Sequence, residues 1–173
     1  MTRRAGRIAA ALLALAGVAA CDRGGGDAAA TDSGFASVLH FDTARVRLVT
    51  AADTIPLTVE LARTDEQKQL GLMERRALGE RAGMLFLYGT TQSDSSGFWM
   101  YRTRIPLDIA FIDSTGTIRT IHTMQPCVSD LSGACPTYVA GARYRAALEV
   151  NAGFFARHRV QPGHRVLLAD TAR

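Results

Sequence analysis

The chain has 173 residues, of which 47% are hydrophobic and 21% are charged. This length and composition suit one globular domain and exclude two. The formal net charge of +4 includes Arg3, Arg4 and Arg7 near the amino terminus, so +4 minus 3 leaves +1 for the rest of the chain. A balance this close to neutral gives no reason to expect a nucleic-acid partner.

Residues 1–20 have the parts of a secretory signal peptide: a positive start, a short apolar run and small residues before a cleavage point. The apolar run is shorter than the roughly 20 residues that a membrane span needs. The block Val18-Ala19-Ala20-Cys21 resembles the lipobox of bacterial lipoproteins. That resemblance implies a lipid on Cys21 and an exported protein anchored to a bacterial membrane, facing the periplasm. A plain signal peptide followed by a chance cysteine is the alternative.

Residues 21–43 are small and polar and have no periodicity, which is typical of a flexible tether. Such a tether would span on the order of 25 Å as a coil. Asp22, directly after the cysteine, resembles an inner-membrane retention signal of enteric bacteria, but that rule is not general, so the inner and outer membranes both stay open. The domain itself is expected over residues 44–173.

The domain begins with a predicted hairpin. Residues 45–50 and 55–62 alternate apolar and polar side chains with a period of two, on either side of a turn at 51–53. Thr64 followed by Gln67 is a capping-box signature, and it predicts a short helix that reaches Leu70 and ends at Gly71. Residues 73–82 are charged and are expected to form a loop.

Further short strands are predicted at 84–88, 98–105, 107–113, 117–124, 144–150 and 165–169, with one or two helical turns at 154–159. A run such as 84–88, apolar on both faces, indicates a central strand. Many short strands with turn signals and little helix predict a mainly β fold, either a β-sandwich or a barrel-like domain with one or two short helices.

Residues 125–140 are expected to form a loop, and within it Cys127 and Cys135 remain as a pair once Cys21 is assigned to the lipid. An oxidising compartment favours a disulfide between them. Closing so short a loop would stabilise the fold by roughly 2–3 kcal/mol in the chain-entropy model. A redox or metal-binding thiol pair is the alternative, although the spacing is not C-x-x-C.

Several sequence blocks occur in the order of a known family: Gln69–Met73, Gly83–Phe86, Phe98-Trp99-Met100, Thr103–Asp113, Ala147–Gly153 and Pro162-Gly163-His164. On these blocks the chain, from about Val46 to Leu168, resembles the bacterial and archaeal family of domain of unknown function 192. His164 departs from the acidic residue that is more frequent there. The resemblance implies a compact, mostly β fold of sandwich or jelly-roll type with one short helix, and no established activity.

Asp108 is the candidate for chemistry, because apolar residues on both faces of its strand indicate a buried carboxylate. Such a group is either a tuned acid or base, or a ligand anchor at the rim of a pocket. The alternative is a structural acceptor for backbone N–H groups near the bend at Pro106. Glu149 is expected to be an exposed cross-strand partner; a second carboxylate beside Asp108 is the other possibility.

Trp99, Met100 and Tyr101 could form an amphipathic wall for a sugar ring or an apolar ligand, with Thr103 and Asp108 beside it. Arg75, with Arg76 and Arg104, could meet an anionic ligand. A simple core around Trp99 and solvated arginines are the alternatives. The 4 histidines are scattered and form no metal motif, and no cofactor fingerprint occurs, so neither a metal nor a cofactor is expected.

Three functions remain open from the sequence. The first is a binding module of the cell envelope for a small ligand held around Trp99, Met100, Thr103 and Asp108. The second is an acid–base enzyme that uses Asp108 to hydrolyse envelope material. The third is an accessory protein that docks on another envelope protein. A pocket with convergent polar groups would favour the first two, and a large exposed apolar patch would favour the third.

Overall fold

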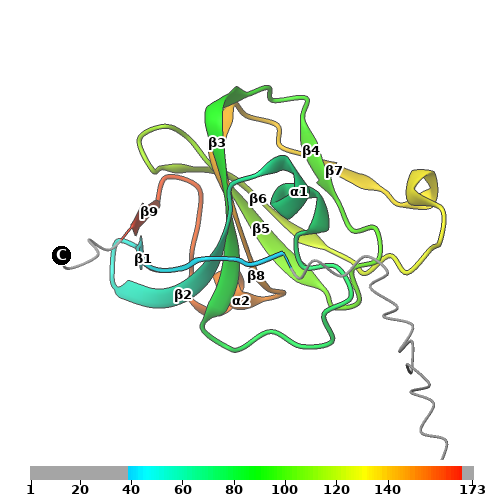
Figure 1. Cartoon of the computed structure of the whole chain (residues 1–173). Helices are drawn as coiled ribbons and strands as arrows, with labels where there is room; N and C mark the ends of the chain where they lie inside the picture. Colours follow the sequence, from blue (N-terminus) through cyan, green and yellow to red (C-terminus); the bar gives the residue numbers. More distant parts are fainter. Residues whose placement is uncertain (1–38, 169–173) are drawn as a thin grey trace, which may run out of the picture. The chain divides into compact units, whose positions relative to one another are not determined.

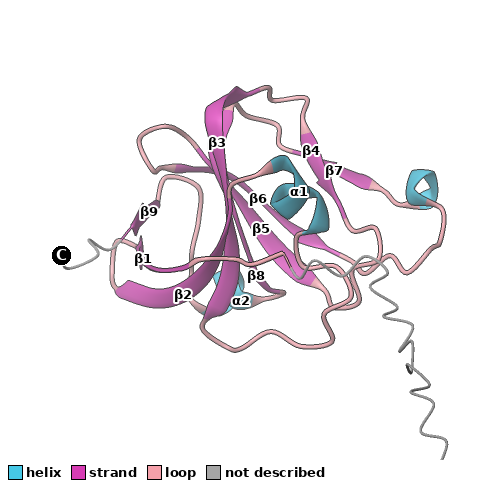
Figure 2. Ribbon diagram, in the orientation of Figure 1, coloured by secondary structure: helices cyan, strands magenta, loops and turns pink. Residues whose placement is uncertain are grey.

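The computed structural model describes residues 39–168, so the expected signal peptide, Cys21 and most of the expected tether lie outside the described residues. The domain is mainly β, as expected, with short helical pieces (Figures 1 and 2). Its elements are β1 (Thr43–Val49), β2 (Thr54–Ala62), α1 (Asp65–Leu70), β3 (Ala82–Gln92), β4 (Gly97–Trp99), β5 (Leu107–Ile112), β6 (Ile118–Met124), the 3₁₀ helix η1 (Ser132–Ala134), β7 (Thr137–Val139), β8 (Tyr144–Asn151), α2 (Phe154–Arg157) and β9 (Arg165–Leu168).

Seven of these strands form one curled sheet, in the order β6-β5-β8-β3-β2-β1-β9. Only β2 and β3 run parallel; the other neighbours are antiparallel. The two edge strands touch only near the starts of β6 and β9, where the Ile118 N–H donates to the His164 carbonyl at 2.8 Å and an isolated bridge joins Thr117 to Arg165. The barrel-like alternative is therefore the correct one, in the form of a curled half-barrel.

The curled sheet is apolar on both faces. One face supplies the inner cluster, to which all seven strands and α2 contribute: Val46, Leu48, Ile55, Leu57, Val59, Leu61, Leu85, Ala110, Ile112, Ile118, Leu148, Val150, Phe154, Phe155, Val160 and Val166. The other face supplies the outer cluster: Ala62, Leu72, Met84, Phe86, Phe98, Met100, Leu107, Ile109, Phe111, Met124, Ala140, Tyr144 and Ala147. Strand β5 lies between the two clusters, so all of its residues are buried and its sequence is continuously apolar apart from Asp108.

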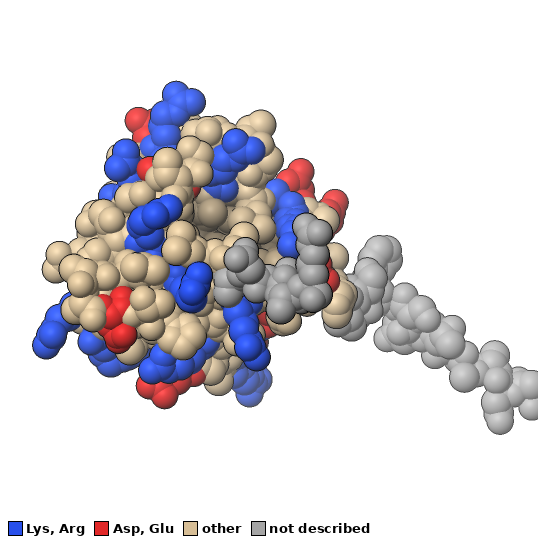
Figure 3. Space-filling model, turned by 90° about the vertical axis from the view of Figure 1, so that its left-hand side faces the viewer, with Lys and Arg blue, Asp and Glu red and all other residues tan. Residues whose placement is uncertain are grey.

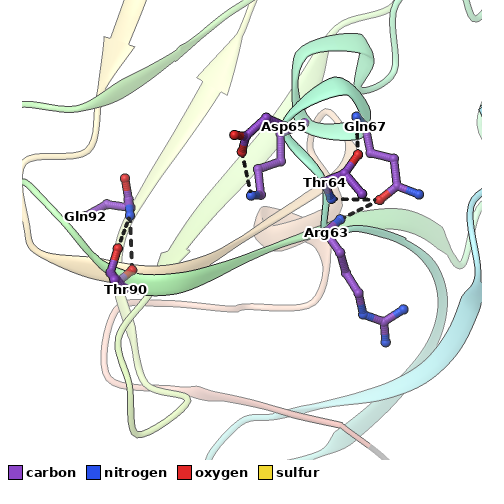
Figure 4. A network of polar contacts seen from close by, with 7 residues as sticks. Arg63, Thr64, Asp65, Gln67, Thr90 and Gln92 are labelled. Carbon is purple, nitrogen blue, oxygen red and sulfur yellow. Dashed lines mark hydrogen bonds and ion pairs between the residues drawn. The ribbon is translucent and has the colours of Figure 1, made fainter.

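The capping box of α1 forms as the sequence predicts (Figure 4). The Thr64 hydroxyl accepts the Gln67 backbone N–H at 3.2 Å, and the Gln67 side chain accepts the Thr64 N–H at 3.0 Å. The Gln67 amide also donates to the His40 carbonyl at 2.8 Å. The helix then ends at Gly71, whose φ of +50° is in the region that favours glycine. The capping contacts therefore fix both where α1 begins and how it sits on the preceding chain.

The region around the disulfide differs from expectation. Residues 125–140 are not only a loop, because β7 pairs there with β4 to make a separate two-stranded sheet. A Cβ at Gly97 would lie 2.5 Å from the Tyr138 carbonyl oxygen, so only glycine permits this close pairing. Strand β3 also continues past Tyr88 to Gln92. Three-residue strands are too short to produce a periodic pattern, which is why the sequence does not reveal β4 and β7 as partners.

Candidate functional site

A groove of about 490 Å³ runs between α1 and the chain that leaves β4. Its lining combines apolar and polar side chains: Glu66, Gln69, Leu70, Met73, Trp99, Tyr101 and Ser132. Leu70 and Trp99 are each 38% exposed, so both offer apolar surface to a ligand in the groove. An open groove with exposed apolar side chains and a few polar groups is the usual setting for a small ligand.

One wall of the groove is a single face of α1 and the turn after it. Glu66, Gln69, Leu70 and Met73 are spaced i, i+3, i+4 and i+7, so they lie on the same side of the helix. No residue of α1 is buried, so this face is open to a ligand. These four residues are not among the site residues predicted from the sequence, although their helical spacing is a local signal that places them on one face.

The opposite wall is aromatic. Phe98 and Met100 are buried in the outer cluster, and the alternation places Trp99 and Tyr101 on the outside. The Trp99 and Tyr101 rings lie 5.4 Å apart between centroids and are tilted by 39°. Trp99 and Tyr101 thus lie side by side along the groove, whereas Met100 is buried beneath them and does not line it.

The loop closed by Cys127 and Cys135 braces this wall. The two sulfur atoms are 2.10 Å apart, at the disulfide distance that the sequence predicts. The Tyr101 hydroxyl donates to the Asp130 carbonyl at 3.4 Å, and the Cys127 N–H donates to the Thr103 carbonyl at 3.3 Å. Thr103 is buried and holds the loop in place instead of facing a ligand. The same loop brings Ser132 to the rim of the groove.

Asp108 lies elsewhere, on the inner face of β5. Its side chain is 2% exposed, and its two oxygens accept the Thr123 hydroxyl at 2.7 Å and the Phe155 backbone N–H at 3.1 Å. Nearby, the Pro106 carbonyl accepts the Ala152 N–H at 3.2 Å. The start of β5 therefore holds the turn that leads into α2. These contacts match the structural alternative for Asp108, with α2 as the segment that it fixes.

Arg75 is also absent from the groove. Its guanidinium donates to both carboxylate oxygens of Glu60, at 2.6 and 2.5 Å, and these hydrogen bonds raise the pKa of Arg75. Arg102 and Arg104 share the carboxylate of Glu74, and each donates from Nε to one of its two oxygens. Arg75 is thus matched by one carboxylate, whereas Arg102 and Arg104 share a single one. Neither Arg75 nor Arg104 lines the groove, so neither is placed to meet an anionic ligand there.

Glu149 is buried, which corrects the expectation of an exposed partner. It is 4% exposed and lies in register between Met84 of β3 and Ile109 of β5, both members of the outer cluster. Burial raises its pKa from 4.5 to about 8. The next residue pair between β5 and β8 is Asp108 with Val150, and Val150 belongs to the inner cluster. The carboxyl groups of Glu149 and Asp108 therefore point to opposite faces of the sheet. They do not form a catalytic pair.

Two further cavities occur in the domain. One, of about 330 Å³, lies at the end of the curled sheet among apolar residues of β3, β8 and β9, with Asp113 and Arg145 at its edge. The other, of about 380 Å³, lies between the β1–β2 turn and the segment that follows α2. Within residues 39–168, no three His, Cys, Asp or Glu side chains gather closely enough to hold a metal ion. In that same range, no helix is long and apolar enough to cross a membrane.

Comparison with known proteins finds a matching family model and similar solved structures. The model of the DUF192 family, described as "Uncharacterized ACR", matches residues 47–168. A crystal structure of a "putative transcription regulator" from Sinorhizobium meliloti 1021 is similar, with 40% identity, a TM-score of 0.68 and coverage of 75% of this chain and 96% of that one. A protein of unknown function from Novosphingobium aromaticivorans DSM 12444 has 31% identity, a TM-score of 0.66 and coverage of 75% and 88%. No curated protein matches the sequence.

Proposed function

The chain belongs to the DUF192 family, and we propose that its domain is an envelope binding module for a small ligand of the saccharide class. The observation that carries this proposal is the half-exposed Trp99, which packs on Tyr101 along an open groove. An exposed aromatic pair of this kind is poorly solvated and gains from contact with an apolar surface. A ligand with a flat apolar face is therefore favoured at this wall.

The groove suits an amphipathic ring. The C–H face of a sugar ring can pack on Trp99, while its hydroxyl groups meet the carboxylate of Glu66, the amide of Gln69 and the hydroxyl of Ser132 across the groove. A purely apolar ligand would leave those polar groups without partners, and a strong anion would meet the carboxylate of Glu66 without a neutralising arginine. Neutral, hydroxyl-rich rings therefore fit the lining best.

Trp99 is the single tryptophan of the chain, so its fluorescence reports directly on the groove. Titration of the full chain with N-acetylglucosamine oligosaccharides and peptidoglycan fragments is expected to give a saturable change in Trp99 emission. Calorimetry of Trp99→Ala is expected to show a loss of affinity of at least about tenfold, because truncating a central aromatic contact typically removes about 2 kcal/mol or more of binding free energy.

Val128→Ala is the matched control, because Val128 is exposed and apolar but does not line the groove. This variant is expected to bind like the wild-type chain. The proposal fails if no saccharide changes Trp99 emission in a saturable way, or if Trp99→Ala binds as tightly as the wild-type chain.

We also propose that the domain is held at a bacterial membrane by a lipid on Cys21, on the strength of the lipobox-like block before it. Cys21→Ala is expected to abolish incorporation of labelled fatty acid and to move the chain out of the membrane fraction of the cell. An equal share of wild-type and Cys21→Ala chain in washed membranes, with equal labelling, would contradict the anchor.

A second function is favoured by the exposed apolar side chains near the groove. Val128 is 67% exposed, Leu131 73% and Val139 47%, and they lie on the disulfide loop and on β7. With Leu70 and Trp99 they make five of the six large hydrophobic side chains that are exposed among the described residues. A patch of this kind is typical of a surface that contacts another protein. If no saccharide changes the fluorescence emission of Trp99, this docking function would be favoured.

A further inference from the structure

A second, differently charged pocket lies away from the aromatic groove. It has a volume of about 380 Å³ and lies between the β1–β2 turn and the segment that joins α2 to β9. Its lining is mostly polar and basic: Thr50, Ala51, Ala52, Asp53, Arg157, His158, Arg159, Gln161 and His164. Figure 3 looks onto the side of the domain that carries β1, β2 and β9, and blue side chains predominate over red ones on that side.

The two arginines of this pocket differ from Arg75 and Arg104. Neither Arg157 nor Arg159 forms an ion pair with any residue in the described range 39–168. Both are exposed at the rim, where the Arg157 guanidinium donates to the Ala152 carbonyl at 3.4 Å. Asp53 is the one acidic residue of the lining, and its Oδ1 accepts the Thr54 N–H at 2.7 Å, which directs it to its own turn. The pocket therefore carries two arginine charges against the one carboxylate of Asp53, an excess of one positive charge.

The pocket also has neutral donors beside these charges. The Nδ1 of His164 accepts the backbone N–H of Gln161 at 3.1 Å, so the proton of the neutral ring is on Nε2. This contact fixes the ring orientation and leaves Nε2–H free to donate. The Gln161 side chain and the imidazole of His158, whose ring packs 4.4 Å from the Phe154 ring, complete the donor set.

From these contacts we propose that this pocket is an anion-binding site for a phosphate group, separate from the saccharide groove and independent of it. Two guanidinium groups can bind phosphate oxygens in a forked manner, and His164 Nε2–H can donate to a third. The small volume suits a compact phosphate ester. The phosphate can belong to a soluble molecule or to a lipid head group, and both present the same oxygens to this pocket.

Calorimetric titration of the full chain with inorganic phosphate, at constant ionic strength, tests the proposal. Constant ionic strength is needed because salt screens exposed charges. Saturable binding is expected, and Arg159→Gln is expected to weaken it by at least about tenfold, since a hydrogen bond to a charged group typically contributes that much. Arg143→Gln is the matched control: Arg143 is exposed in the β7–β8 loop and does not line the pocket, so the same charge is lost elsewhere.

Glycerophosphoglycerol, a water-soluble phosphodiester, distinguishes the two sources of the phosphate. Tighter binding of this diester than of inorganic phosphate would assign the pocket to a lipid head group, and the reverse would assign it to a soluble phosphate. The proposal is overturned if neither probe binds in a saturable way. It is equally overturned if Arg143→Gln weakens binding as much as Arg159→Gln, because the effect would then be one of total charge.

Discussion

Glu149→Gln is expected to make the domain more stable than the wild type at pH 8, by about 2–4 kcal/mol, and to remove most of the pH dependence between pH 5 and 8. The reason is the burial of Glu149, which raises its pKa in the folded chain from 4.5 to about 8. The folded protein therefore holds this proton more tightly than the unfolded chain does. Between these two pH values the unfolded chain carries fewer protons, so the free energy of unfolding falls as the pH rises.

The slope in this window is about 1.4 kcal/mol per pH unit for one proton. The stabilising effect of the protonated form is complete below about pH 4.5 and is lost as the pH rises through about 8. Glutamine is neutral throughout, so it avoids the penalty of burying a charge. Other carboxyl groups act outside the window: the pKa values of Glu66, Glu74 and Asp113 are lowered, so their contributions change only in more acidic solution.

Urea unfolding of both chains at pH 5, 6, 7 and 8 measures the effect. Glu80→Gln is a suitable control, because Glu80 is an exposed glutamate in the loop before β3. That variant is expected to follow the wild-type profile. Parallel profiles of the wild type and Glu149→Gln, with no convergence towards pH 5, would show that the Glu149 carboxyl group titrates normally in the folded protein.

Local patterns predict the parts of this fold that depend on local contacts. The β1–β2 hairpin follows from strict alternation, and α1 from the Thr64–Gln67 capping box, because both features are fixed by residues a few positions apart. The continuous apolar run of β5 correctly indicates a strand that is buried on both faces. The family resemblance agrees with the mainly β class, although the local pattern alone does not decide between a sandwich and a half-barrel.

The misassigned residues are those whose environment is set by distant segments. Glu149 alternates with apolar neighbours, which is also the pattern of an exposed residue on a half-buried strand. It is buried because the outer face of the sheet is covered by residues such as Leu72 and Met100, which come from remote parts of the chain. The groove also depends on tertiary contacts. Its lining joins residues of α1 to Trp99, which lies on β4 in the two-stranded sheet, and to Ser132 of the disulfide loop. No local window of the sequence contains that information.

Asp108 is buried, as the apolar residues on both faces of its strand predict, but the sequence does not reveal the groups that bind its carboxyl oxygens. Its strand parity showed that the carboxyl group had to be buried and satisfied. The satisfying groups are the Thr123 hydroxyl across the strand pair and the Phe155 N–H, 47 positions away in sequence. Because α2 has only four residues and Gly153 at its N-cap gives no side-chain capping bond, the Asp108 carboxylate replaces the missing cap.

Asp108→Ala is therefore expected to lower the free energy of unfolding by about 2–4 kcal/mol, because it leaves the buried Phe155 N–H without an acceptor and opens a small cavity. Thr123→Val, which removes only the hydroxyl partner, is expected to lose about 1 kcal/mol. Hydrogen exchange gives the local test, since the Phe155 amide should lose protection in Asp108→Ala before the amides of β1 and β2 do. The opposite result would be an Asp108→Ala variant that keeps wild-type stability and Phe155 protection but alters ligand binding or turnover. The carboxyl group would then act in ligand binding or catalysis and would not stabilise the turn into α2.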